Sequence, residues 1–130
     1  MNKEKLAIEL TRMRNGNPVS GLSDYAVESI CKGRSSYPVA NLLTFCQALS
    51  LQMVITDLAT DESYPVDTID EVHDVLQMLM KRWQIDDSCM YRKTGIHYTA
   101  PKGKTGSLSI VTMLAMCSAL HCKLDFVHTN

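Results

Sequence analysis

Residues 46–55 read CQALSLQMVI, and residues 117–126, which lie 71 positions later, read CSALHCKLDF. Extending the match outward places PVANLLTFCQALSLQMVITD (38–57) over SIVTMLAMCSALHCKLDFVH (109–128). A chain that repeats itself in this way is expected to contain two similar structural units. Four aligned positions are identical in the two copies: Leu43 with Leu114, Cys46 with Cys117, Ala48 with Ala119, and Leu49 with Leu120.

Each copy of the repeat has the apolar spacing of a helix. Apolar residues recur at helical intervals over 39–49 and 110–120, which predicts a helix in both places. Leu49 and Leu120 lie on these stripes at equivalent positions, so both are expected to be core residues. The two aligned cysteines lie on the same stripes, so we interpret them as small core side chains.

A short alternating run follows each of these helices. The runs at 52–58 and 123–128 have the pattern of strands, and each copy also begins with an apolar helical stripe, near 6–13 and 72–83. Because a lone strand leaves its backbone groups unmatched, we expect the two strands to pair, either within one chain or across a homodimer.

Composition bounds the class of protein. A chain of 130 residues with 45% hydrophobic residues fits one ordinary domain, or two small ones that share a core. No apolar run is long enough to span a membrane, and no charged-then-apolar signal segment opens the chain. Five cysteines in no obvious framework indicate a reducing compartment. The expected localisation is cytoplasmic.

The net charge of −1 conceals an uneven distribution along the chain. Residues 57–74 carry seven acids and no Lys or Arg, whereas residues 1–56 carry a net charge of +2 and residues 75–130 a net charge of +4. Turn residues and acids in TDESYPVDT (60–68) are typical of an exposed linker. We therefore expect a first unit at 1–59, an acidic linker at 60–69 and a second unit at 70–130, with one joint globular domain as the alternative.

The middle of the first unit, GLSDYAVESICKGRSSYP at 21–38, has the signals of a short helix. Ser23 is placed to cap its N-terminus, and Gly33 to end it in a left-handed conformation. The helical spacing turns Val27 and Ile30 inward. The residues expected to face outward are Asp24, Tyr25, Glu28, Ser29 and Lys32.

This pattern resembles the lambda-repressor-like (Xre/Cro type) helix-turn-helix family. The residues that carry the resemblance are Gly21-Leu22-Ser23, Val27, Ile30, Gly33, Leu42 and Ala48-Leu49. In the second unit, IDDSCMYRKTGIHYTA (85–100) resembles the second helix of that family, its turn and the start of a recognition helix, and GKTGSLSIVTMLAMCSAL (103–120) resembles the remainder. The resemblance implies a mainly α fold made of two helix-turn-helix units, each ending here in a short strand.

Both units depart from the family pattern. Gly16, Asn17 and Pro18 stand where a helix should precede the recognition helix of the first unit, so that helix is expected to be short, displaced or missing. In the second unit, Pro101 and Gly103 interrupt the recognition helix. If the chain recognises a DNA sequence, as this family does, the first unit is therefore expected to do most of that recognition.

The resemblance implies sequence-specific binding of double-stranded DNA and a role in transcriptional regulation, in a bacterial or mobile-element setting. A recognition helix shows polar side chains to base edges, while flanking basic groups neutralise phosphates. Tyr25 and Ser29 suit base edges, and Ser23 opens the helix that carries them. The expected phosphate contacts are Lys32, Arg34, Ser35 and Ser36, and the polar, basic equivalent in the second unit is His97, Tyr98, Thr99, Lys102 and Lys104.

The same residues also fit two other interpretations. The fold could serve as a protein-interaction or dimerisation module that has lost DNA reading, and the polar groups could be an ordinary solvated surface. Catalysis is not expected, because the histidines show no fixed spacing to a nucleophile and GKTGS (103–107) lacks the spacing of a phosphate-binding loop. No cofactor or metal is expected either, since the Cys and His spacings match no standard zinc pattern.

Overall fold

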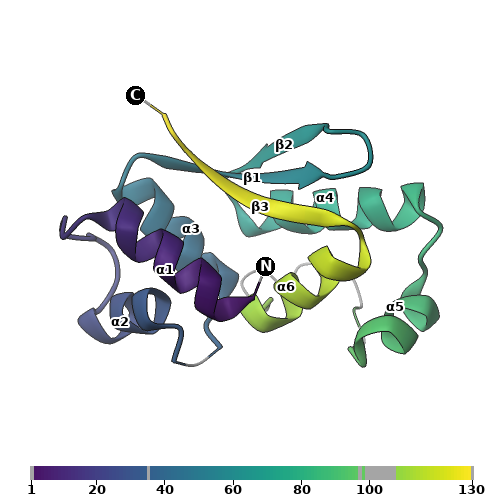
Figure 1. Ribbon diagram of the computed structural model, residues 1–130, viewed down its shortest axis with the longest axis horizontal. Helices are drawn as coiled ribbons and strands as arrows, with labels where there is room; N and C mark the ends of the chain where they lie inside the picture. The colour runs from purple at the N-terminus through teal and green to yellow at the C-terminus, as the bar shows by residue number, and fades with distance from the viewer. Residues whose placement is uncertain (1, 35, 97, 99–107, 130) are drawn as a thin grey trace.

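The computed structural model describes residues 2–34, 36–96, 98 and 108–129 of the chain. The sheet lies along one side of the molecule and the helices along the other (Figure 1). Among the described residues we find no helix with the length and apolar character that a membrane span requires. The elements of this part of the chain are α1 Lys3–Arg14, α2 Asp24–Lys32, α3 Val39–Ala48, β1 Leu51–Asp57, β2 Ser63–Val66, α4 Ile69–Arg82, α5 Asp87–Thr94, α6 Ile110–Ala119 and β3 Cys122–His128.

The expectation of a mainly α chain of two helix-turn-helix units, each with its own terminal strand, is wrong. The described residues form six helices and one three-stranded antiparallel sheet of order β2-β1-β3, which makes the fold mixed α/β. The strand that changes the class is β2, which lies within residues 60–69, where we expected a linker. Its Tyr64 pairs with Ile55 and its Val66, only 1% exposed, pairs with Met53. This acidic segment is therefore part of a β-hairpin and not an extended linker.

The predicted pairing of the two repeated strands is confirmed within one chain. β1 and β3 are antiparallel over their whole length, from Leu51 opposite His128 to Asp57 opposite Cys122. At the centre of the ladder, Val54 faces Asp125, which is the residue that the repeat aligns with it. A residue that pairs with its own repeat equivalent lies on a two-fold axis that relates the two copies.

A second contact lies on the same axis, in the helical layer. Pro38 forms an isolated antiparallel bridge with Ser109, and these two residues are again repeat equivalents. The amide of Val39 donates to the Leu108 carbonyl and the amide of Ile110 to the Tyr37 carbonyl, both at 2.8 Å. The two hydrogen bonds are related to each other by the axis. The copies of the repeat are thus arranged as a pseudo-symmetric pair inside one chain.

One core is shared by both copies. α1 contacts α6 and α4 contacts α3, so the first helix of each copy packs on the third helix of the other. Cys46 and Cys117 are buried, as predicted. Leu120 is fully buried, but its equivalent Leu49 is only partly buried, so the expectation of two equal core positions is wrong. Exact repeat equivalence fails where the surroundings of the two copies differ.

The copies differ most in their middle helices. An offset of 71 residues would place the counterpart of α5 at 16–23, but α1 ends at Arg14 and no helix forms over 16–23. Asn15 takes a left-handed conformation with φ of 49° and caps α1, and Gly16 and Pro18 follow. The predicted loss of a helix in the first unit is confirmed, and α2 is left without the neighbour that a helix-turn-helix would supply.

Candidate nucleic-acid interface

The candidate reading helix, α2, is fixed at both ends by the residues that the sequence indicated. The Ser23 hydroxyl accepts a hydrogen bond from the Ala26 amide at 3.1 Å. At the other end Gly33 has a φ of 60°, and its amide donates to the Ser29 carbonyl. These caps satisfy backbone groups that a nine-residue helix would otherwise leave open. Both predicted caps are confirmed.

α2 is held closely against α1 (Figure 1). The Thr11 hydroxyl donates to the Cys31 carbonyl at 2.8 Å. A Cβ atom built on Gly33 would lie 3.2 Å from the Ala7 Cβ and 3.3 Å from the Lys3 carbonyl oxygen. The end of α2 therefore approaches the start of α1 as closely as packing allows, which gives the exposed side of α2 a defined position.

Tyr25 and Ser29, the two residues expected to reach base edges, are placed very differently. Tyr25, in the first turn of α2, is 75% exposed. Ser29 is 6% exposed, so the expectation that it faces outward is wrong. Ser29 lies one helical turn before Gly33, on the side of α2 that α1 covers. Of the two, only Tyr25 is free to contact a ligand.

Basic groups gather at the C-terminal end of α2, around one acid. Lys32 Nζ and Arg34 Nη1 lie 2.8 Å and 3.1 Å from the same Glu28 carboxylate oxygen. The hydrogen bond from Lys32, with the charges of Lys32 and Arg34, lowers the pKa of Glu28. One acid therefore offsets one of the two basic groups. Ser36 is exposed beside them, and Ser35 lies outside the described residues.

Lys3 is a basic residue near this end of α2 that no local motif indicates. Its carbonyl lies beside Gly33, which brings the first turn of α1 to the end of α2. The two positions are 30 residues apart, so only tertiary packing brings them together. The first turn of α1, which carries Lys3, therefore borders this end of the interface.

The second unit offers one described candidate, Tyr98, and it is not at the surface. Tyr98 is 5% exposed, so it does not lie at the surface, where the expected contact with DNA would require it to be. Its hydroxyl shares a hydrogen bond of 2.5 Å with Nδ1 of His73, and the two rings are stacked with centroids 5.7 Å apart. Burial raises the pKa of Tyr98 to about 12, so the hydroxyl stays neutral. The other candidates, His97, Thr99, Lys102 and Lys104, lie outside the described residues.

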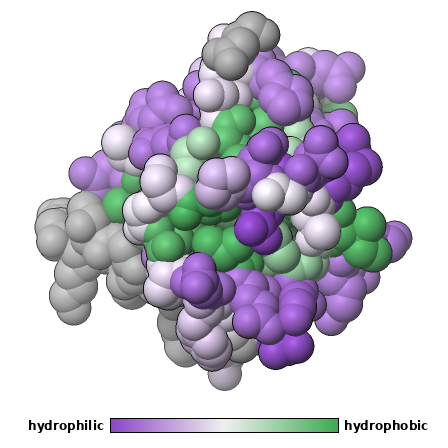
Figure 2. Space-filling model, turned by 90° about the vertical axis from the view of Figure 1, so that its left-hand side faces the viewer, coloured by the Kyte–Doolittle hydropathy of each residue, from purple (hydrophilic) through white to green (hydrophobic). Residues whose placement is uncertain are grey.

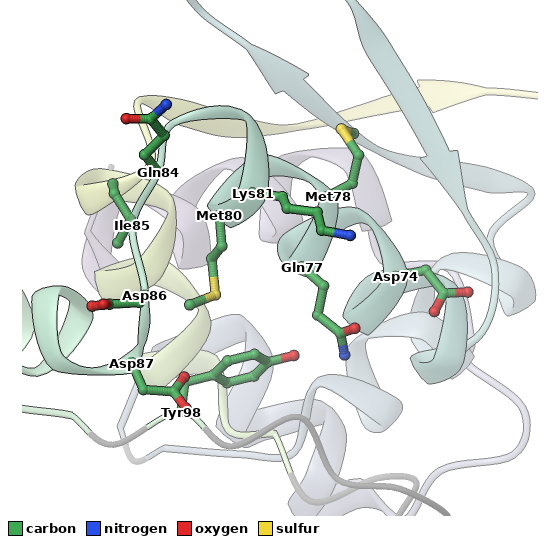
Figure 3. A pocket seen from close by; sticks show the side chains of 10 residues that line it. All are labelled: Asp74, Gln77, Met78, Met80, Lys81, Gln84, Ile85, Asp86, Asp87 and Tyr98. Atoms are coloured by element: carbon green, nitrogen blue, oxygen red, sulfur yellow. The ribbon is translucent and has the colours of Figure 1, made fainter.

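Tyr98 also borders a hollow of about 800 Å³ beside α4 and the start of α5. Figure 3 shows Met80, Gln77 and Tyr98 extending into the same space. The charged residues that line it are three acids and one lysine: Asp74, Asp86, Asp87 and Lys81. This excess of negative charge does not favour the binding of phosphate. We therefore do not assign this hollow to the nucleic-acid interface.

The buried His73 makes stability depend on pH. Burial lowers its pKa against the opposing effect of Asp70 and Asp74, and its Nε2 has no hydrogen-bond partner in the described part of the chain. The unfolded chain therefore takes up this proton first as the pH falls through about 6.5, and the folded state loses stability. We expect the urea midpoint to fall between about pH 7.5 and pH 5.5, and to fall less in His73→Gln.

The matched control for this titration is Tyr98→Phe, which removes the hydroxyl but keeps the buried imidazole. It should lower stability at every pH while leaving the pH slope in place. A slope that is the same in the parent chain and in His73→Gln would show that other groups cause the dependence.

Comparison with known proteins gives no further guide to this interface. No protein-family model, curated protein or solved structure matches the chain. The features that bear on function are the exposed end of α2 and the pseudo-symmetric pairing of the repeat.

Proposed function

We propose that this protein binds double-stranded DNA in a sequence-specific manner through α2 and acts as a transcriptional regulator. The observation that carries the proposal is Tyr25, which is 75% exposed in the first turn of a helix capped at both ends and packed on α1. Helices that read DNA present their N-terminal residues to base edges in the major groove. A phenol there can both donate and accept a hydrogen bond.

Lys32 and Arg34 supply the phosphate contacts in this proposal. Both are exposed, and both are paired with Glu28 in the free protein. Exposed ion pairs of this kind contribute little to stability, so exchanging Glu28 for a phosphate costs little. Neutralised phosphates release counterions, which is the main source of affinity for DNA.

The internal two-fold arrangement supports the same proposal. Dimeric regulators match their own two-fold axis to a palindromic site, and here one chain carries a pseudo-two-fold axis through Val54 and Asp125. Because α2 and α5 occupy different positions in the two copies, the half-sites should be unequal. We therefore expect an imperfect palindrome in which one half carries most of the sequence information.

The test uses DNA selected from a random pool, followed by binding titrations on the selected site and on random duplex. Tyr25→Ala should lose about 1–3 kcal/mol of discrimination between the two, the usual value of a good base contact. Ser29→Ala is the matched control, since a buried residue should leave the preference unchanged. Lys32→Ala and Arg34→Ala should weaken both duplexes alike and reduce the salt slope by about one each.

The same titrations separate the proposal from its main alternative, a protein-interaction module. Ile8 on α1 is 71% exposed, and Figure 2 shows apolar surface gathered centrally on one face with polar surface around it. Such a surface suits a protein partner. If the parent chain binds no duplex even at low salt, the interaction reading replaces DNA binding; if it binds but Tyr25→Ala keeps full discrimination, α2 is not the reading element.

A further inference from the structure

Two cysteines meet where α6 passes into β3. Cys117 lies in the last turn of α6 and Cys122 is the first residue of β3. The turn between them is made by Leu120 and by His121, which has a φ of 54°. Both thiols are buried, at 4% and 6% exposure, and they hydrogen bond to each other without a disulfide.

The two thiols also line one hollow of about 220 Å³. Exposed Ser118, His121 and Lys123 form part of its wall, so the hollow extends from the surface to these two residues. Lys123 also forms an ion pair with Asp125, in which the ammonium and carboxylate groups lie 3.6 Å apart. The described residues hold no group of three or more side chains placed to bind a metal ion. The hollow therefore offers a small polar molecule access to a pair of thiols.

The first copy of the repeat lacks this pair. Cys46 is the equivalent of Cys117, but the position equivalent to Cys122 is Leu51. Burial raises the pKa of Cys46 to about 12. The hydrogen bond from Cys117, by contrast, holds the pKa of Cys122 below its usual value, against the effects of burial and of Asp57. The first copy thus has a single cysteine here that stays protonated, whereas the second copy has a pair of cysteines.

We propose that Cys117 and Cys122 form a reversible redox site that takes a peroxide as its substrate and closes to an intramolecular disulfide. The Cys122 thiolate attacks one peroxide oxygen, the O–O bond breaks, and the leaving hydroxide takes a proton to form water. The sulfur of Cys117 then attacks the sulfenic acid on Cys122, the S–O bond breaks, and a second water leaves with the proton of Cys117. Two thiols lose two electrons, and the peroxide gains them.

The experiment treats the folded full-length chain with hydrogen peroxide, blocks the remaining thiols with a maleimide and measures intact and peptide masses. We expect a loss of about 2 Da, two fewer blocked thiols and a peptide that joins Cys117 to Cys122, reversed by a dithiol reductant. Cys46 should stay reduced. In the described part of the chain Cys31 and Cys89 are the half-buried cysteines, and they serve as internal references for non-specific oxidation.

The decisive variant is Cys122→Leu, which copies Leu51 of the first repeat. The rate at which Cys117 reacts with peroxide should then fall by a factor of about ten or more, because no neighbouring thiolate initiates the reaction. Cys122→Ser keeps a polar group at the site and covers the case in which leucine disturbs folding, which circular dichroism detects. The proposal is overturned if Cys117 and Cys122 stay reduced while Cys31 and Cys89 oxidise, or if the crosslink forms only in the unfolded chain.

Discussion

Leu120→Ala should lower the free energy of unfolding by about 2–5 kcal/mol, the range for removing a fully buried leucine side chain. Leu120 has 0% exposure at the end of α6, and its amide donates to the Met116 carbonyl at 2.8 Å. It follows a helix whose Cys117 and Met116 are also buried, so the surrounding side chains have little room to close a cavity. Urea denaturation followed by circular dichroism measures the loss.

Leu49→Ala is the matched control for this prediction, because it removes the same side chain at the equivalent position of the other copy. Leu49 is only partly buried, and its expected loss is about 1–2 kcal/mol since part of the side chain is already in water. The difference between the two losses of stability shows whether they follow the burial of each leucine or its equivalent position in the repeat. Equal losses would show that burial in the two copies is the same, against the structure.

The sequence was most informative where a periodic pattern coincided with the repeat. The stripes over 39–49 and 110–120 correspond to α3 and α6, and the two alternating runs pair as β1 and β3. Periodicity predicts such elements because a helix or strand with one buried face must repeat its apolar residues at the spacing of that face. Pairing could be predicted because an isolated strand leaves hydrogen bonds unmade.

The strand β2 could not be predicted in the same way. Its sequence, SYPV, is short, contains a proline and follows acids. Proline is tolerated on an edge strand, and β2 is an edge of the sheet. The pairing partner, β1, decides that this segment is a strand rather than a linker, and local composition does not reveal the partner.

The candidate site shows the same division between local and distant causes. Ser23, Gly33 and the exposed Tyr25 follow from the spacing within α2. The burial of Ser29 and Tyr98 does not: Ser29 lies one turn before Gly33, whose neighbours are residues of α1, and Tyr98 is hydrogen bonded to His73 of α4. Both covering elements are distant in sequence, so a helical pattern alone assigned these side chains to the wrong surface.

Asp57→Ala should lower the free energy of unfolding by about 1.5–3 kcal/mol, the usual value of hydrogen bonds to a charged group. Asp57 is fully buried at the end of β1, where it accepts hydrogen bonds of 2.9 Å from the Ala59 amide and from Arg82. Burial acts to raise its pKa, but these hydrogen bonds outweigh burial and the pKa is lowered. The carboxylate is therefore charged in the folded state and ties the β1–β2 hairpin to the end of α4.

A double-mutant cycle with Arg82→Met separates the ion pair from the effect of removing Asp57 alone. Arg82→Met leaves a buried carboxylate that keeps backbone donors, from Ala59 and Thr60, but has lost its positive partner. It should therefore destabilise at least as strongly as Asp57→Ala. Removing both partners removes the uncompensated charge, and the double variant should lose less than the sum of the single losses. The contribution of Asp57 should also vanish in acid, as the pH falls below its ordinary pKa of about 3.9 and then through its lower value in the folded state. Additive losses in the cycle would mean that the hairpin is held by its backbone alone and that the 2.9 Å contact between Arg82 and Asp57 contributes no coupling energy.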